Sequence, residues 1–133
     1  MLEKLKFHHI GYAVKDIDAT AKFYTDCGWD KSDTMTDTIQ NTYIAFLCRE
    51  GFPPIELVAP IDKKSPINNI LQKVGVGTYH TCYEVPNMDA AIIELRAKRF
   101  MPLFKPVNAV AMDNHKICYL IHPQVGLIEL VEV

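Results

Sequence analysis

The sequence predicts an α+β fold built from two similar βαβββ modules, and two repeated patterns carry this prediction. The tetrapeptide Ile-Glu-Leu-Val occurs twice, once around Glu56 and once around Glu129. The segment "HIGYAVKDIDA", which begins at His9, also matches "HTCYEVPNMDA", which begins at His80, at an offset of 71 residues. The offset becomes 73 where "IAFL" matches "ICYL" and Glu56 matches Glu129. A register that persists at both ends of each half indicates an internal duplication.

Each half has the same order of local patterns. Strand-forming residues open both halves, and Asp16 or Asn87 then offers an N-cap before apolar residues at helical spacing. Gly28 lies where a left-handed residue would end the first helix. The opening strands are expected at residues 6–14 and 78–85, and the later ones at 30–38, 42–48 and 54–59, and at 100–105, 107–112 with 116–121, and 126–132.

A connecting helix is expected between the halves. In "SPINNILQKVG", Ser65 is predicted to be the N-cap, Pro66 the first helical residue and Gly75 the end. Its apolar residues form one stripe that would pack onto the modules. We therefore expect a single domain over residues 1–133, with module one at about 5–60, the helix at about 65–75 and module two at about 77–133.

Composition limits the classes of partner. Hydrophobic residues make up 49% of the chain and charged residues 23%, as in an ordinary globular protein. The net charge of −2, without any Lys/Arg run, gives no reason to expect nucleic acid or an anionic membrane surface as a partner. The N-terminal residues do not have a secretory signal pattern, and no apolar stretch approaches membrane-spanning length. We expect a cytoplasmic protein that binds small molecules.

Two histidines and two glutamates occupy equivalent positions of the repeat: His9, His80, Glu56 and Glu129. Small residues share the strand face of each histidine, and each glutamate lies inside an apolar strand. A lone His or Glu in a strand more often has a packing or surface role. If the modules pair about an approximate twofold axis, however, all four side chains converge. Two imidazoles and two carboxylates would suit one divalent metal, namely Ni, Co, Fe, Mn or Zn.

The other histidines and the cysteines are expected to have structural roles. His8 points to the face opposite His9, and we expect His115 and His122 to be solvated or locally hydrogen-bonded. All four cysteines are isolated in apolar contexts, which is typical of small core residues in a reducing compartment. Cys82 is close enough to His80 to line the site, although packing is its expected role.

The motifs "HHIGYAV", "IELVAP", "SPI", "YHTCYEV" and "GLIELVE" together resemble the vicinal oxygen chelate superfamily, in the branch that holds glyoxalase I and methylmalonyl-CoA epimerase. The resemblance covers essentially the whole chain. It implies the glyoxalase/bleomycin resistance/dioxygenase fold, in which paired βαβββ modules form a cup-shaped mixed sheet around a metal. Carried over by position, the family's metal ligands fall on His9, Glu56, His80 and Glu129. It also implies a homodimer, with the metal site inside one chain or shared between two.

The resemblance implies a proton-transfer enzyme. A metal with open positions stabilises an enolate-like oxyanion, and a glutamate moves the proton; we expect Glu129 to be this base first and Glu56 second. We favour a glyoxalase I-like (lactoylglutathione lyase type) enzyme, because the bacterial glyoxalase I arrangement resembles this two-His, two-Glu set and is associated with Ni or Co. Such an enzyme converts the thiohemiacetal of methylglyoxal to a lactoyl thioester through a metal-bound enediolate.

The first alternative is methylmalonyl-CoA epimerase, whose substrate is an acyl-CoA rather than a thiol conjugate. Epimerases commonly have Gln where this chain has Glu56, and a second base where it has Ile39, with Asp37 the nearest carboxylate. A non-catalytic binding protein of the same scaffold generally lacks the metal residues, and an extradiol dioxygenase ranks last. Possible anion contacts, each expected to be a solvated surface charge instead, are Arg49, Lys105 and Lys116.

Overall fold

The computed structural model describes residues 2–133, which form two compact units. The first unit comprises residues 9–79, and the second comprises residues 80–133 together with residues 2–8. Strands β1 (Lys6–Ala13) and β6 (Gly77–Val85) each contribute residues to both units. Each unit combines helices with parallel and antiparallel strand pairs, so the predicted α+β class with a mixed sheet is confirmed.

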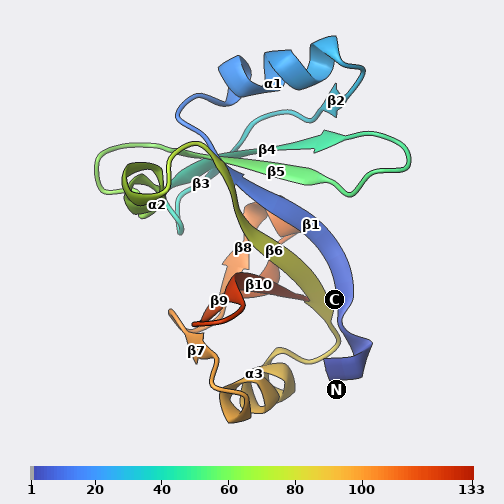
Figure 1. Cartoon of the computed structure of the whole chain (residues 1–133), viewed down its shortest axis with the longest axis vertical. Helices are drawn as coiled ribbons and strands as arrows, with labels where there is room; N and C mark the ends of the chain where they lie inside the picture. The colour runs from blue at the N-terminus through green and yellow to red at the C-terminus, as the bar shows by residue number, and fades with distance from the viewer. Residues whose placement is uncertain (1) are drawn as a thin grey trace. The chain divides into compact units, whose positions relative to one another are not determined.

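The sheet of the first unit has the strand order β2-β4-β5-β1, and β3 also pairs with β4. Strand β5 is parallel to β1 and antiparallel to β4. Helix α1 (Ile17–Asp26) packs on β4 and β5, and α2 (Ile67–Lys73) contacts β5 (Figure 1). The remaining strands of this unit are β2 (Asp30–Lys31), β3 (Met35–Asp37), β4 (Thr42–Cys48) and β5 (Ile55–Pro60).

The sheet of the second unit has the equivalent order β6-β10-β9-β7, and β8 also pairs with β9. Strand β10 is parallel to β6 and antiparallel to β9. Helix α3 (Met88–Ala97) contacts β7 and β10. The remaining strands of this unit are β7 (Met101–Pro102), β8 (Val107–Ala109), β9 (His115–His122) and β10 (Gly126–Glu132). The unit also contains two 3₁₀ turns, η1 (Leu2–Lys4) and η2 (Val110–Met112).

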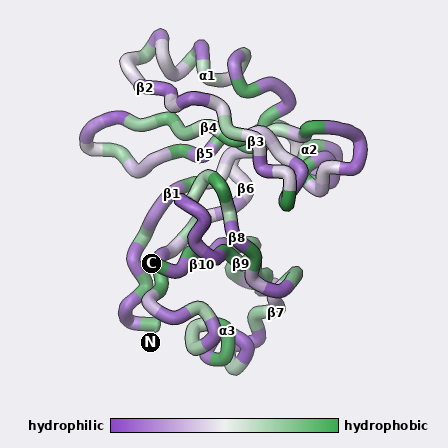
Figure 2. Tube along the Cα trace, turned by 180° about the vertical axis from the view of Figure 1, so that it is seen from behind, coloured by the Kyte–Doolittle hydropathy of each residue, from purple (hydrophilic) through white to green (hydrophobic). Residues whose placement is uncertain are grey.

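Helices α1 and α3 begin as the sequence predicts. The Asp16 carboxylate accepts a hydrogen bond from the Ala19 amide at 3.0 Å, and the Asn87 side chain accepts one from the Ala90 amide at 2.9 Å. Hydrophilic and hydrophobic residues alternate along both helices, as expected of helices that cover one face of a sheet (Figure 2). Within residues 2–133 no helix is long and apolar enough to cross a membrane.

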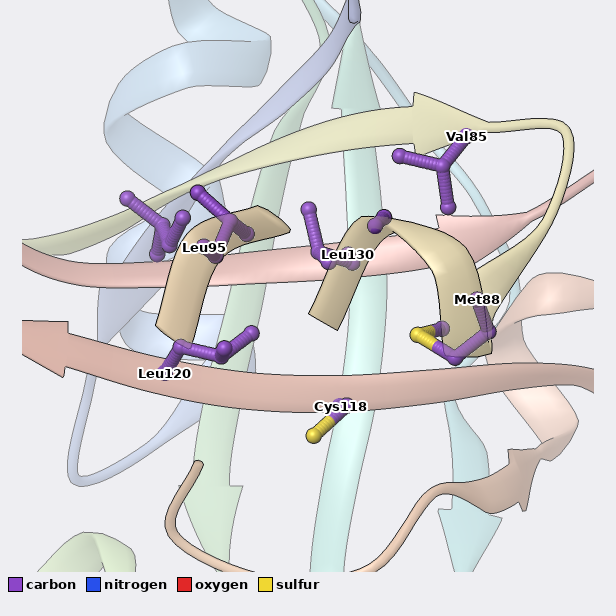
Figure 3. Packing of buried hydrophobic residues seen from close by; sticks show 8 residues of the cluster. Val85, Met88, Leu95, Cys118, Leu120 and Leu130 are labelled. Atoms are coloured by element: carbon purple, nitrogen blue, oxygen red, sulfur yellow. The ribbon is translucent and has the colours of Figure 1, made fainter. Parts of the chain in front are cut away.

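The two hydrophobic cores repeat each other. In the first unit Ala45, Leu47 and Leu57 lie beneath α1, and in the second unit Cys118, Leu120 and Leu130 occupy the positions 73 residues later beneath α3 (Figure 3). The inward faces of equivalent strands are therefore the same in both modules. The opposite faces of these strands are left to carry the polar residues of the candidate site.

The ends of α1 and α3 show how far the repeat extends. Gly28 ends α1 with φ +92, and Arg99, 71 residues later, ends α3 with φ +72. In both places the next amide, that of Trp29 or Phe100, donates to a carbonyl of the last helical turn at 3.0 Å. The same capping geometry is thus built once with glycine and once with a residue that L-amino-acid sterics disfavour there.

Replacing Arg99 by glycine is expected to stabilise the protein by about 0.5–1 kcal/mol, because glycine adopts a positive φ without the Cβ clash. Chemical denaturation would show a higher midpoint with an unchanged slope. The matched change Gly28→Ala should lower the midpoint, since a Cβ there meets no atom closer than the Arg49 guanidinium at 3.7 Å and the cost is therefore one of backbone conformation. A destabilised Arg99→Gly protein would contradict this account.

The Cys118 thiol makes the stability of the protein depend on pH in the alkaline range. Burial raises the pKa of Cys118 from 9.0 to about 11, and the Glu129 carboxylate adds to the increase while Arg96 opposes it. The thiol donates to the Phe104 carbonyl at 3.2 Å. Between pH 9 and pH 11 the unfolded chain loses this proton while the folded chain keeps it. The unfolded state then binds fewer protons, so stability falls as pH rises.

The free energy of unfolding is therefore expected to fall by about 1–2 kcal/mol between pH 9 and pH 11 through this one group. Urea denaturation across that range measures the fall. The Cys118→Ala variant, which places here the residue that module one has at Ala45, should show a shallower dependence. Parallel curves for the two proteins would mean that another group controls alkaline stability.

Three predicted strands are shorter than expected. The strand predicted at residues 30–38 breaks at Ser32, whose hydroxyl accepts the Phe46 amide at 2.8 Å in place of a backbone carbonyl. The strand predicted at residues 107–112 ends at Ala109, because the left-handed pair Asp113 and Asn114 turns the chain and residues 110–112 form η2. The strand predicted at residues 100–105 is reduced to β7.

The predicted N-cap of the connecting helix is also corrected. The Ser65 hydroxyl does not cap α2, whose N-cap is Pro66 without a side-chain bond. It accepts instead from the Ile61 amide at 2.9 Å and donates to the Asn41 carbonyl, which ties the turn before β4 to the loop before α2. Local competition for the hydroxyl explains the difference. Gly75 follows the helix with φ +99 as expected.

The prediction that all four cysteines are core residues is half right. Cys82 and Cys118 are buried, but Cys27 and Cys48 are exposed. Cys27 is the C-cap of α1 and Cys48 is the last residue of β4. An apolar sequence context does not distinguish the end of an element from its buried middle.

Candidate metal centre

The first unit places a histidine, a glutamate and an aromatic ring together. Gly11 of β1 lies opposite Glu56 of β5, and Phe46 of β4 lies opposite Glu56 on its other side. His9 Nε2 is 3.5 Å from Glu56 Oε1, and the edge-on rings of His9 and Phe46 have centroids 5.6 Å apart. We call His9, Glu56 and Phe46 the first half-site.

The second unit builds the same arrangement. Cys82 of β6 lies opposite Glu129 of β10, and Tyr119 of β9 lies opposite Glu129 on its other side. His80 Nε2 is 3.1 Å from Glu129 Oε1, and the edge-on rings of His80 and Tyr119 have centroids 5.1 Å apart. His80, Glu129 and Tyr119 form the second half-site.

The duplicated sequence explains why the two half-sites match. Residues 71 apart in the opening strands and 73 apart in the later strands take the same places in the hydrogen-bond register of each unit. A slip of one residue in any strand would move its side chain to the opposite face. The offsets seen in the sequence therefore describe real structural equivalence.

The histidine and the glutamate of each half-site are buried, which is costly for carboxylates. Glu56 is 3% exposed and Glu129 2%, while His9 and His80 are 0% and 4% exposed. A carboxylate so far from water needs a charged or hydrogen-bonding partner, and each has an imidazole nitrogen beside it. Each of the four residues also offers one ligand atom to a metal ion. Imidazole nitrogen with carboxylate oxygen fits divalent zinc, nickel, cobalt, manganese or iron.

The predictions for the remaining histidines hold. His115 Nδ1 lies 2.6 Å from the Glu132 carbonyl oxygen, and His122 Nδ1 accepts from the Gln124 amide at 3.0 Å. Both are thus locally bonded. The burial pattern of β1 alternates so that His9 is fully buried and His8 only partly, which agrees with their predicted opposite faces.

The possible anion contacts are surface residues, as expected: Arg49, Lys105 and Lys116 are all exposed. Arg49 donates to the Cys27 carbonyl at 2.6 Å and lies over the Phe52 ring, so its role in this unit is structural. Lys105 and Lys116 belong to the long loop and strand start of the second unit.

The aromatic rings beside the histidines were not predicted from the sequence. Phe46 and Tyr119 are the third residues of the matched tetrapeptides "IAFL" and "ICYL". The signal was therefore present in the repeat, but period-two alternation gives the face of a strand and not the side chain that reaches across to the next one.

Comparisons with known proteins identify the family. Residues 8–119 match the model of the Glyoxalase/Bleomycin resistance protein/Dioxygenase superfamily. The chain is 30% identical over 121 residues to the mitochondrial methylmalonyl-CoA epimerase of Homo sapiens, covering 90% of this chain and 67% of that protein. The chain thus spans about two thirds of the length of this relative. Because this relative is named as a mitochondrial protein, the cytoplasmic localisation expected from the sequence stays a prediction.

Solved structures show the same fold. Methylmalonyl-CoA epimerase from Mycobacterium tuberculosis has a TM-score of 0.82 and 30% identity, with 96% of this chain and 87% of that chain covered. A variant of the Streptomyces coelicolor epimerase, in complex with 2-nitronate-propionyl-CoA, has a TM-score of 0.80 and 28% identity, with 96% of both chains covered. The chain therefore belongs to the Glyoxalase/Bleomycin resistance protein/Dioxygenase superfamily and is one of its enzymes.

Proposed function

We propose that the chain is a divalent-metal-dependent epimerase of methylmalonyl-CoA or a closely related α-substituted acyl-CoA. The observation that carries this proposal is similarity over nearly the whole chain to proteins named methylmalonyl-CoA epimerase, one of them bound to an acyl-CoA analogue. The sequence favours a glyoxalase I-like enzyme with the epimerase as its alternative. The comparisons support that alternative better, so we reverse the order.

The two half-sites supply the chemistry that this reaction needs. We propose that His9, Glu56, His80 and Glu129 hold one divalent ion, which when bound acts as a Lewis acid on a substrate carbonyl. The Glu129 carboxylate then takes the α-proton of the thioester. The Glu129 carboxylate is positioned for this step beside His80 Nε2, and the residue is only 2% exposed. Glu56, at the equivalent place in the first half-site, is the second candidate for holding a proton.

Residue 39, in the turn before β4, cannot act as the second base. Ile39 is 64% exposed and carries no titratable group. Asp37 is buried, but its two carboxylate oxygens accept from the Gln40 amide at 2.9 Å and from the Gln40 side chain at 2.7 Å. Both oxygens thus hold the turn, which makes Asp37 a structural residue in our proposal.

A glyoxalase I-like activity is the second candidate, and Glu56 favours it. The resemblance associates two histidines with two glutamates in bacterial glyoxalase I, whereas epimerases commonly have glutamine at this position. The first half-site contains this glutamate, buried beside His9. Both reactions begin with removal of a proton next to a carbonyl, so the half-sites alone suit either.

A paired assay tests the proposal. Protein loaded with Ni, Co or Zn is given methylmalonyl-CoA and, separately, the hemithioacetal of methylglyoxal, and exchange of the α-proton in deuterated water is followed by NMR. We expect turnover of methylmalonyl-CoA. Activity on the hemithioacetal alone would overturn the proposal in favour of glyoxalase I chemistry, and activity on neither would favour a binding protein.

We also propose that residues 1–133 act as a single domain of two modules. Equivalent half-sites in the two units support this organisation, since neither half-site alone has the four donors of the proposed ion. A homodimer is a further prediction, which light scattering of the purified protein tests.

A further inference from the structure

The two half-sites differ in one functional group. They match in histidine, in glutamate and in register, but module one has Phe46 where module two has Tyr119. The second half-site therefore contains a phenol hydroxyl that the first lacks. It is also the half-site that contains Glu129, the residue we propose as the base.

The geometry of the second unit brings this ring over the base. Tyr119 is on β9 and His80 is on β6, and β10, which carries Glu129, lies between these two strands. Strands two places apart are separated by about 9.6 Å, twice the usual spacing. The ring centroids of Tyr119 and His80 are nevertheless only 5.1 Å apart. Both rings must lean over β10, where the Glu129 side chain lies.

The Tyr119 ring and backbone both contact the segment before β8. The Phe104 ring packs against it at 5.8 Å, and the Tyr119 carbonyl accepts the Leu103 amide at 2.9 Å. Tyr119 is only partly buried, whereas His80 and Glu129 are buried. A phenol is longer than a carboxylate, so its hydroxyl can extend past Glu129 to a bound substrate.

Few other groups on this sheet face could donate a hydrogen bond to a substrate. Alternation along β6 places Thr78, Cys82 and Glu84 on the face of His80, and Thr78 lies at the exposed start of the strand. Cys82 has a weakly donating thiol, and Glu84 is an acceptor whose carboxylate lies 4.0 Å from Lys6 Nζ. Of the two residues paired with Glu129 in the sheet, Cys82 and Tyr119, only Tyr119 thus carries a hydroxyl.

We infer that the Tyr119 hydroxyl donates a hydrogen bond to the thioester oxygen of the substrate as negative charge develops there. This inference rests on the proposed function. As the α-carbon–hydrogen bond breaks, the proton passes to the Glu129 carboxylate and the electron pair enters the forming carbon–carbon double bond, which shifts the carbonyl electrons onto oxygen. The hydroxyl keeps its own proton and stabilises this charge, as donors of an oxyanion hole do.

The test compares Tyr119→Phe with the wild-type protein for two ligands. The first, 2-nitronate-propionyl-CoA, carries a negative charge that is conjugated with the thioester carbonyl, and the second, propionyl-CoA, carries no such charge. We expect Tyr119→Phe to weaken nitronate binding about 10- to 100-fold by calorimetry and to lower kcat by about 10²-fold, with KM and propionyl-CoA binding nearly unchanged.

Tyr83→Phe is the matched control. It also removes a phenol hydroxyl from β6, but Tyr83 faces away from His80 and packs on Phe7 at 5.8 Å, so binding and turnover should equal those of the wild type. Equal nitronate affinity in Tyr119→Phe and wild type would overturn the inference, and so would an equal loss for both ligands. A wild-type protein that neither binds the nitronate nor turns over methylmalonyl-CoA would instead refute the proposed function.

Discussion

Replacing Glu129 by glutamine is expected to lower turnover of methylmalonyl-CoA by about 10²- to 10⁴-fold, the usual contribution of a general base. The amide has nearly the shape of the carboxylate but cannot take the α-proton. Because Ile128 and Leu130 pack into the core on the opposite face of β10, the substitution at Glu129 keeps the packing of this strand. Steady-state kinetics measures the loss, and the thermal unfolding midpoint checks that the fold survives.

The matched variant is Glu56→Gln, in the equivalent place of the first half-site. If Glu129 is the principal base, Glu56→Gln should lose much less activity than Glu129→Gln. The reverse order would exchange the roles of the two residues. Equal and complete losses would mean that both carboxylates handle the proton, one on each side of the α-carbon.

The sequence predicted the register of the sheets because a duplicated pattern carries positional information. Offsets of 71 and 73 residues placed each histidine and glutamate on the correct strand and face, and the structure pairs β1 with β5 as it pairs β6 with β10. Period-two alternation then determined which side chains are buried together. Local patterns on each strand and a global repeat agreed, which is what makes such a prediction reliable.

The predictions at residues 32 and 65 were wrong because a serine hydroxyl took the place of a backbone group as hydrogen-bond partner. Nothing in the apolar pattern shows that the Ser32 hydroxyl accepts the Phe46 amide, or that the Ser65 hydroxyl serves the turn at Ile61 and not the helix. The turn at Asp113 and Asn114 had a readable signal, since these residue types tolerate a left-handed backbone. The sequence did not show, however, that this turn signal would outweigh the strand-like apolar pattern of residues 110–112.

The choice of reaction could not be predicted for a different reason. Both candidate enzymes need the same buried donors, so His9 and Glu56 or His80 and Glu129 indicate the class of chemistry and not the substrate. Substrates are distinguished by the side chains around the donors. The contact between the Tyr119 and His80 rings, which suggests a role for Tyr119, follows from the structure and not from the sequence. Comparison with whole proteins supplied the rest.

Replacing either imidazole should remove the whole metal ion if the two half-sites share it. We expect wild-type protein to bind one divalent ion per chain, and both His9→Ala and His80→Ala to lose it at ion concentrations that saturate the wild type, because a site with three remaining donors binds much more weakly. Mass spectrometry of the metal content after dialysis measures the stoichiometry, and His115→Ala, in an exposed position on β9, is the control.

Stability provides a second measurement of the same ion. At an ion concentration of 100 times Kd, binding stabilises the folded state by about 2.7 kcal/mol, so wild-type protein should unfold at a clearly higher temperature with metal than without it. His9→Ala and His80→Ala should each lose this increase, although the residues belong to different units. If either variant kept its ion and its thermal shift, each half-site would bind metal separately, and Glu56 and Glu129 could not act on one substrate.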